Sequence, residues 1–259
     1  MRRLLTTLLL LMLSAAAAHA RQQQPAPAAR LVEEFGEIQI SDLMARLDNF
    51  AIELQNDPTA TGVIAAYGAS HKFPGWAMRR AHVSRNYLVN SRGLDRTRLM
   101  SVFAGLRDET TFQLWFVPAG AVPPVTPFDP SLLMAGARSP LPFDRYTVIE
   151  RGDRSESEYG DQYPDDPGLY DIFAAALRSD PALRGCVIGY TSRRRSLAAG
   201  RRIAARAKLT IAKSYALDVT RVAALAGGRR EYKMIELWLV PPGAPLPKPS
   251  PPARRAPRK

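Results

Sequence analysis

The residues Leu47-Asp-Asn-Phe-Ala-Ile-Glu-Leu-Gln-Asn-Asp-Pro58 decide the fold, because a related stretch returns as Tyr170-Asp-Ile-Phe-Ala-Ala-Ala-Leu-Arg-Ser-Asp-Pro181. An apolar run follows each of them, at residues 62–68 and at residues 185–191. Pro58 and Pro181 are 123 positions apart, and the same interval separates Tyr67 and Tyr190, Asp95 and Asp218, Arg98 and Arg221, Gly105 and Gly228, Trp115 and Trp238, and Pro118 and Pro241. One ungapped interval over so long a span predicts two copies of one domain.

The pattern within each copy predicts strand, helix, strand, helix, strand, strand. In the first copy, apolar residues recur at three and four positions after Ser41-Asp42, which we expect to cap a helix that ends at Asp57-Pro58. The other elements expected in this copy are a helix at 75–90 and strands at 31–40, 63–67, 98–103 and 110–117; the second copy repeats the order, with helices at 169–177 and 197–215 and strands at 186–190, 221–225 and 232–240. This order predicts an α/β (α+β) two-layer sandwich, made of two tandem βαβαββ domains with helices packed on one face of a mixed sheet.

Composition places the domain limits at residues 31–118 for the first copy and 144–241 for the second. Residues 119–143 are rich in Pro, Gly and Ala and are predicted to be a linker, and the Pro- and Arg-rich residues 242–259 are predicted to be disordered or polyproline-like. The start of the second copy stays open. Residues 145–150 have the pattern of its first strand, yet Glu158-Tyr-Gly160 echoes Glu34-Phe-Gly36 at an interval of 124, so an insertion must lie nearby.

The first 20 residues have the pattern of a signal peptide. Arg2-Arg3 gives a positive start, an apolar stretch follows at 4–13, and Ala16-Ala-Ala-His-Ala20 ends in a small-x-small pattern suited to cleavage. We therefore expect the mature chain to begin at Arg21, with a flexible lead-in over 21–30, and to be periplasmic or secreted. No later stretch is long and apolar enough to predict a transmembrane segment.

The composition is that of a globular protein with an excess of basic residues. The chain has 259 residues, of which 46% are hydrophobic and 23% charged, enough for two domains that each bury a core. The formal net charge of +12 suits an anionic partner, such as an acidic cell-wall polymer, but it equally suits a merely soluble basic protein. We expect no nucleic acid among the partners.

Catalysis is not expected, because the chain offers few groups for it. The histidines are His19 in the leader, His71 and His82, and the second copy has no matching histidine. The paired carboxylates Asp165-Asp166 and Glu156 with Glu158 lie in a polar insertion and are interpreted as solvated. The sole cysteine, Cys186, falls on an apolar run and is expected to be a buried small side chain. No phosphate-cradling glycine loop and no Cys/His spacing predicts a cofactor or a metal.

Each copy also has a tryptophan in its last strand pattern, Trp115 and Trp238. Side chains alternate between the faces of a strand, so each tryptophan lies on the face opposite to its leucine neighbour, and we expect these rings to pack in a core or at a contact between the domains. The alternative is an exposed platform on which sugars or bases stack.

The second copy resembles the OmpA-like peptidoglycan-binding domain. The resemblance rests on Val187-Ile-Gly-Tyr-Thr-Ser192 with the Asp180-Pro181 before it and an Arg-rich helix after it, and in the first copy on Arg79-Arg-Ala-His-Val-Ser-Arg-Asn-Tyr-Leu88 with Gly93-Leu-Asp95. It covers roughly residues 31–118 and 145–241. In that family a strand ends in Gly-x-Thr-Asp and the next helix carries Leu-Ser-x-x-Arg-Ala-x-x-Val.

The resemblance implies a ligand clamp in which an aspartate binds the ammonium and an arginine the carboxylate of the diaminopimelate unit of peptidoglycan. The aspartate position falls on Ala69 in the first copy and Ser192 in the second, so the acidic half of the clamp is missing from both. The arginine position falls on Arg80, with Arg79 beside it, in the first copy; the second copy has Ile203 there, with Arg202 and Arg206 nearby.

The candidate ligand-binding residues are therefore Arg79, Arg80, Ser192, Arg194, Arg202 and Arg206. The run Arg193-Arg-Arg195 beside Arg201-Arg202 is the densest positive cluster outside the tail, and its alternative reading is a solvated loop. We predict an exported, non-catalytic cell-envelope protein that binds peptidoglycan or another anionic envelope polymer. The alternative is a structural or protein-interaction module that keeps the OmpA-like fold without peptidoglycan binding.

Overall fold

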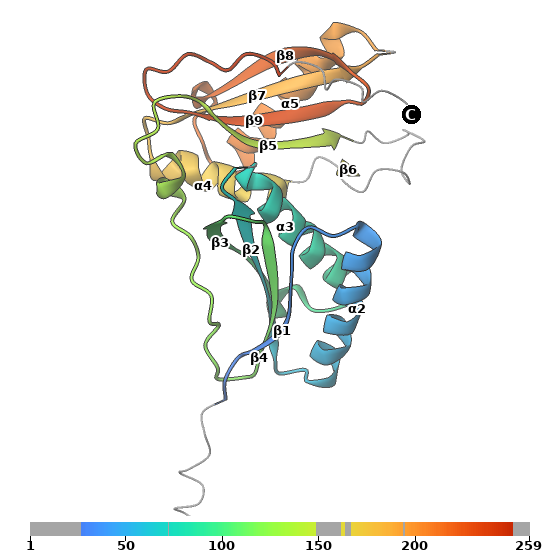
Figure 1. Ribbon diagram of the computed structural model, residues 1–259. Helices are drawn as coiled ribbons and strands as arrows, with labels where there is room; N and C mark the ends of the chain where they lie inside the picture. Colours follow the sequence, from blue (N-terminus) through green and yellow to red (C-terminus); the bar gives the residue numbers. More distant parts are fainter. Residues whose placement is uncertain (1–26, 72, 149–161, 164–166, 194, 251–259) are drawn as a thin grey trace, which may run out of the picture.

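The computed structural model of the chain describes residues 27–71, 73–148, 162–163, 167–193 and 195–250 (Figure 1). It contains two mixed sheets with strand orders β1-β4-β2-β3 and β6-β5-β9-β7-β8. The first copy consists of β1 Arg30–Phe35, α2 Ile40–Asn56, β2 Thr61–Ala69, α3 Pro74–Asn90, the 3-10 helix η1 Arg96–Arg98, β3 Leu99–Arg107 and β4 Thr111–Val117. After the 3-10 helix η2 Pro130–Met134, the second copy consists of β5 Leu141–Val148, β6 Gln162–Tyr163, the 3-10 helix η3 Pro167–Tyr170, α4 Asp171–Ser179, β7 Arg184–Ser192, α5 Leu197–Ser214, the 3-10 helix η4 Val219–Arg221, β8 Val222–Arg230 and β9 Met234–Val240.

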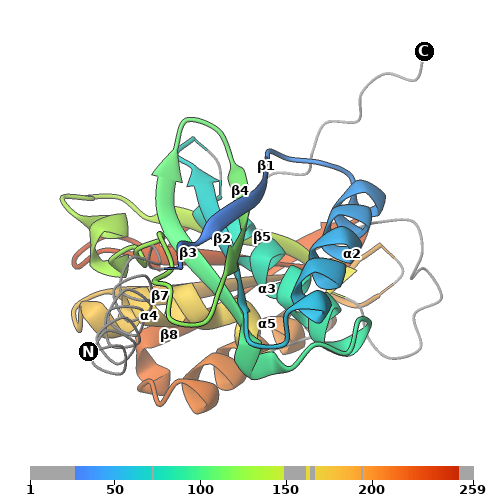
Figure 2. The ribbon, with the colours of Figure 1, turned by 90° about the horizontal axis from the view of Figure 1, so that it is seen from below.

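The predicted fold class is confirmed. The strands before and after the second α-helix of each copy are parallel, β2 with β3 and β7 with β8, and the last strand runs antiparallel to its neighbours. In the second sheet the short β6 also pairs in parallel with β5. The helices cover one face of each sheet (Figures 1 and 2). The large core clusters lie on that face, and a smaller apolar cluster lies on the outer face of each sheet.

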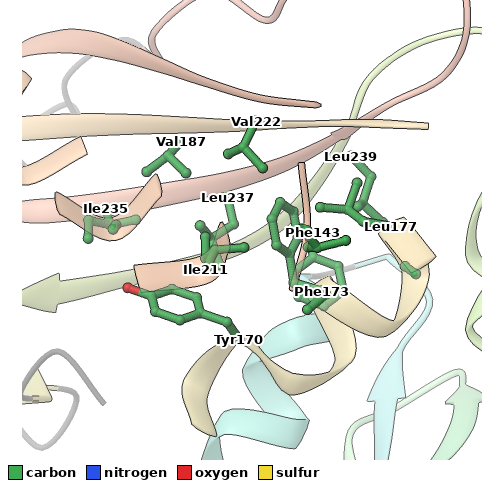
Figure 3. Packing of buried hydrophobic residues seen from close by; sticks show 14 of the residues in the cluster. Phe143, Tyr170, Phe173, Leu177, Val187, Ile211, Val222, Ile235, Leu237 and Leu239 are labelled. Atoms are coloured by element: carbon green, nitrogen blue, oxygen red, sulfur yellow. The ribbon is translucent and has the colours of Figure 1, made fainter. Parts of the chain in front are cut away.

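The core of the second copy is assembled from all of its layers, as Figure 3 shows. Phe143 of β5 and Phe173 of α4 lie with ring centroids 5.3 Å apart and are both almost completely buried. Tyr170 of η3 is also fully buried, and its hydroxyl accepts a hydrogen bond from the hydroxyl of Tyr146 in β5 at 2.8 Å.

The repeat is exact in the register of the inner strands. Ala65 pairs with Gln113 in the first sheet, and Ile188 pairs with Glu236 in the second, so both partners have shifted by 123 positions. The first strand differs. Glu34 pairs with Gln113 but Arg145 with Glu236, an interval of 111, so the second copy has 12 additional residues between its first strand and its first helix.

Two details differ from the sequence prediction around this insertion and the first helix. The first strand of the second copy begins at Leu141, inside the stretch predicted as linker, because its residues pair with β9. The candidate echo at 158–160 lies outside the described residues. Helix α2 begins at Ile40 rather than after a Ser41-Asp42 cap: Gln39 is the cap residue, and its carbonyl accepts from the amide of Leu43 at 3.0 Å.

One arginine in each copy ties the first helix to the sheet in the same way. The guanidinium of Arg98 donates to the carbonyls of Leu54, Asp57 and Ala60, and that of Arg221 donates to those of Leu177, Asp180 and Leu183. These carbonyls lie at and beyond a helix C-terminus, where they have no intrahelical donor. The matched arginines of the repeat are therefore structural.

The segments after β4 and β9 are ordered rather than a free linker and tail. Each begins with the same turn, in which Ala121 donates to Pro118 at 3.0 Å and Ala244 donates to Pro241 at 3.2 Å. Ala121 packs on the outer cluster of the first sheet and Ala244 is part of the outer cluster of the second. Of the stretch predicted to be disordered or polyproline-like, residues 242–250 follow the outer face of the second sheet, and residues 251–259 lie outside the described part.

Candidate anion-binding site

Arg79 of α3 does not face solvent but joins the two copies. Its side chain and that of Asp144 in β5 are each only 1% exposed and form a bidentate ion pair, with Nε to Oδ2 at 2.9 Å and Nη2 to Oδ1 at 3.3 Å. The guanidinium also donates to the carbonyl of Arg145 at 3.2 Å and lies 5.3 Å from the ring centre of Tyr146. The predicted ligand-binding Arg79 is therefore engaged by a carboxylate of the same chain.

Arg80 is also largely buried, at 5% exposed. Its Nη2 donates to the carbonyl of Ile38 at 2.9 Å, and its guanidinium lies 5.8 Å from the ring centre of Trp76. The first copy thus uses both of its predicted ligand-binding arginines in internal contacts.

The outer side of α3 packs against β5, η3 and α4 of the second copy over the first half of the helix (Figure 1). Gly75 lies so close to β5 that a Cβ there would come 2.5 Å from a ring carbon of Phe143. Further along the helix, His82 is 6% exposed and its ring fills the place where a Cβ on Gly168 of η3 would stand, at 2.0 Å. Its Nε2 is 2.9 Å from the side-chain amide of Asn86.

Helix α5 has the same place in the second copy, but its outer side is not covered by the described residues. A cavity of about 600 Å³ opens there, lined by Arg195, Ser196, Ala199, Arg202, Ile203, Arg206 and Lys233. The residues come from the start of α5 and from the turn between β8 and β9. We call this cavity the basic pocket.

The charge in the basic pocket suits an anion. Arg195, Arg202, Arg206 and Lys233 carry four positive charges, and the first turn of α5 contains no acidic residue. The pocket also reaches the N-terminus of α5, where Ser196 makes no side-chain cap and the helix dipole favours negative charge.

The repeat relates the lining of this cavity to a position that is filled in the first copy. The positions of Ala199, Ile203 and Arg206 correspond to Trp76, Arg80 and Val83 in the first copy. Trp76 fills the space there, packing edge-on against Phe112 with ring centroids 6.0 Å apart. Replacing an indole by a methyl group leaves the space that becomes the pocket.

The structure brings two of the predicted site residues together and separates the others. Arg202 and Arg206 both line the basic pocket. Ser192 ends β7, half-buried and paired with Arg230 rather than lining the pocket, and Arg194 lies outside the described residues. Lys233 was missed because its counterpart is Thr110, so the repeat gives no signal for a charge at that position.

The remaining candidates have structural surroundings. The indoles of Trp115 and Trp238 donate to Gln113 and Glu236, and both rings pack against the outer apolar clusters. Cys186 is buried, and its burial raises the pKa of the thiol to about 12, so the thiol stays protonated at neutral pH.

Comparisons with known proteins do not place the chain in a family. No protein-family model matches it, and no curated protein matches it at a significant level. Within the described ranges, no cluster of His, Cys, Asp or Glu could hold a metal ion. Over the same residues, every helix falls short of the length and apolar character that crossing a membrane requires.

Proposed function

We propose that the protein is an exported, non-catalytic binding protein of the cell envelope that holds peptidoglycan or another anionic envelope polymer in the basic pocket of its second copy. The observation that carries the proposal is the convergence of Arg195, Arg202, Arg206 and Lys233 on one cavity. Three of these are arginines, whose planar forks bind carboxylates and phosphates with two parallel hydrogen bonds. The resemblance to OmpA-like domains favours the same class of ligand.

The two copies have different roles in this proposal. The first copy contributes its arginines to the joint between the domains and holds the second copy in place. The second copy presents the free side of α5 to the polymer. Binding through one site per chain follows, although the chain has two copies of the domain.

Co-sedimentation of residues 21–259 with purified peptidoglycan sacculi tests the proposal. We expect binding that survives physiological salt and falls at least fivefold in Arg202→Ala, because one charged hydrogen-bonding group is lost. Arg201→Ala is the matched control: it removes the same charge from the next, exposed position of α5, outside the pocket lining.

Two outcomes contradict the proposal. Binding that vanishes at physiological salt in all variants reduces the interaction to nonspecific attraction of a basic protein. Equal losses in Arg201→Ala and Arg202→Ala show that charge, not the pocket, is responsible.

A second candidate function is a protein-interaction module. Leu197 and Leu209 are 53% and 61% exposed on α5, the helix that lines the basic pocket, where a protein partner would cover them. The sacculus experiment separates the two, since a protein-interaction module does not sediment with sacculi at physiological salt.

A further inference from the structure

Residues 241–250, here called the strap, run across the outer face of the second sheet, on the side opposite to the helices. Pro241, Ala244 and Pro247 are buried, while the residues between them are exposed. Burial at every third position is the pattern of a polyproline II helix, which has three residues per turn and places every third side chain on one side. The prolines of the strap favour this conformation.

The strap follows the direction of β7 over most of that strand. Arg184, at the start of β7, donates from Nη2 to the carbonyl of Ala244 at 2.7 Å. Tyr190, near its end, accepts at its hydroxyl from the amide of Ser250 at 2.8 Å. Six residues of polyproline II helix span about 19 Å and six residues of strand about 20 Å, so the two courses match in length.

These contacts hold the strap by its main chain. Arg184 binds a carbonyl, Tyr190 binds an amide, and Arg230 donates to the carbonyl of Ser250. Main-chain groups are the same in every peptide. The sheet therefore selects an extended backbone with small or proline side chains toward it, rather than one particular sequence.

Beneath the strap lies a buried polar network. The hydroxyl of Tyr190 donates to Glu236 Oε2 at 2.8 Å, and the indole of Trp238 donates to the same oxygen at 3.3 Å. Tyr190 is 0% and Glu236 2% exposed, and the guanidinium of Arg230 lies 4.1 Å from the ring centre of Tyr190. The network orients the tyrosine hydroxyl, because its proton is donated to Glu236 and its lone pair remains to accept the strap amide.

The first copy lacks this arrangement although it shares the framework. Tyr67, Arg107 and Trp115 stand at the matched positions, with Gln113 in place of Glu236. Its segment after β4 leaves for β3, where the amide of Phe128 donates to Phe103 at 2.9 Å. Arg107 is held by Glu34 at 3.5 Å instead of a peptide carbonyl. A clamp for an extended peptide is thus a property of the second copy.

We propose that the outer face of the second sheet is a binding groove for extended proline-rich peptides, and that the strap occupies this groove in cis in place of a proline-rich segment of a partner protein. Aromatic rings, an arginine and a preformed polyproline II ligand are the elements of proline-rich recognition in general. The hydrogen bonds that fix the strap along β7 are made to its main chain, so another proline-rich segment can make the same ones. This groove is on the opposite face of the sheet from α5 and does not depend on the basic pocket.

Fluorescence anisotropy tests the groove by measuring how a fluorescent peptide binds to residues 21–259. The peptide has the strap sequence, Pro-Pro-Gly-Ala-Pro-Leu-Pro-Lys-Pro-Ser. The double variant Ala244→Asp/Pro247→Asp puts charges at buried strap positions and releases the strap. Pro245→Asp/Pro249→Asp adds the same charge at exposed positions and keeps the strap in place. We expect saturable binding to the released variant, and at least tenfold weaker binding to the control and the wild type, because a tethered strap competes at an effective concentration on the order of millimolar.

Tyr190→Phe in the released variant identifies the groove as the place of binding. It removes the acceptor for the peptide amide, and we expect a loss of affinity of about fivefold to tenfold. Unchanged affinity overturns the proposal, as does equal binding to the released variant and the control, or no binding to a released variant with a native circular dichroism spectrum.

A measurement on the wild type makes the test independent of variant folding. Adding about 10 mM unlabelled peptide, above the effective concentration of the tethered strap, should speed hydrogen exchange of the Ser250 amide, because the strap is displaced from Tyr190. Exchange that stays unchanged at saturating peptide would show that the strap is a fixed part of the domain and would overturn the proposal.

Discussion

Helices α3 and α5 hold equivalent places in the two copies, yet the described residues cover α3 on two sides and α5 on only one. Arg79 and Arg202 are matched by the interval of 123, and both extend from the outer side of their helix. Arg79 meets Asp144 and is 1% exposed, whereas Arg202 is exposed at the basic pocket. An arginine at the equivalent position thus forms a structural ion pair in the first copy and is a candidate ligand-binding group in the second.

The difference begins in the first helix of each copy. Helix α4 corresponds to the last nine residues of α2, and the first half of α2 has no α-helical counterpart among the described residues of the second copy. The 3-10 helix η3 stands there, and its Gly168 contacts α3. In the first copy that side carries the full α2, and Glu33, the register equivalent of Asp144, pairs with Arg46 of α2.

The largest change in stability that tests the difference between the two copies is expected from Asp144→Ala. It leaves Arg79 buried without its carboxylate, which costs about 3–5 kcal/mol in a buried ion pair. The matched change Glu33→Ala breaks a half-exposed pair and should cost less than about 1 kcal/mol. Urea denaturation of both variants measures the difference. Similar losses in the two would mean that the Arg79 pair is no more buried in solution than the pair on the first copy.

A large effect, equal in both copies, is expected from Arg98→Ala and Arg221→Ala. Each removes a guanidinium that donates to three main-chain carbonyls, and we expect a loss of about 2–4 kcal/mol in each case. The free energy of unfolding from denaturant titration gives the test. A difference beyond about 1 kcal/mol between the two would contradict their structural equivalence, given the usual spread of such contributions.

A smaller effect separates the two helices at Gly75 and its counterpart Ala198. In Gly75→Ala the new methyl group meets Phe143, and overpacking of this kind costs about 1–3 kcal/mol, partly offset by a gain of up to ~1 kcal/mol in helix propensity. Ala198→Gly on the exposed side of α5 should lose only helix propensity, about 1 kcal/mol or less. Thermal unfolding monitored by circular dichroism compares them. A stabilised Gly75→Ala protein would show that α3 and β5 can separate without penalty.

The smallest effect is a pH dependence of stability that Tyr190 gives to the second copy. Burial, and then the bond to Glu236, raise the pKa of Tyr190 from 10.0 to about 12. With this raised pKa, the free energy of unfolding does not change with pH below about pH 10. It falls as the pH rises from 10 toward 12, because the tyrosine of the unfolded chain releases its proton first. In a Cys186→Ala background, which removes another group of the second copy whose raised pKa adds to this fall, Tyr190→Phe should make the fall in stability less steep. An equal slope with and without the tyrosine hydroxyl would place the hydroxyl in solvent.

Much of the fold could be predicted from the sequence, since its signals are local or repeated. The order of elements follows from apolar periodicity, and the equivalence of Arg98 with Arg221 follows from the interval of 123. The candidate site was predicted only in part. Arg202 and Arg206 were found through an arginine-rich helix, but Lys233 joins them from a turn 27 positions beyond Arg206 and has no charged counterpart in the first copy.

The sequence by itself determined that the chain holds two copies of one domain. Apolar periodicity is a local signal, and the constant interval of 123 is read by comparing the two halves of the sequence, so neither requires knowledge of how the chain folds. Tertiary structure alone decided which arginine is buried and which is free. Arg79 and Asp144 are 65 positions apart, and their contact depends on how one domain packs on the other. An arginine has the same charge and reach in either place; the dielectric environment and the partner that the packing supplies decide whether it holds the protein together or remains open to a ligand.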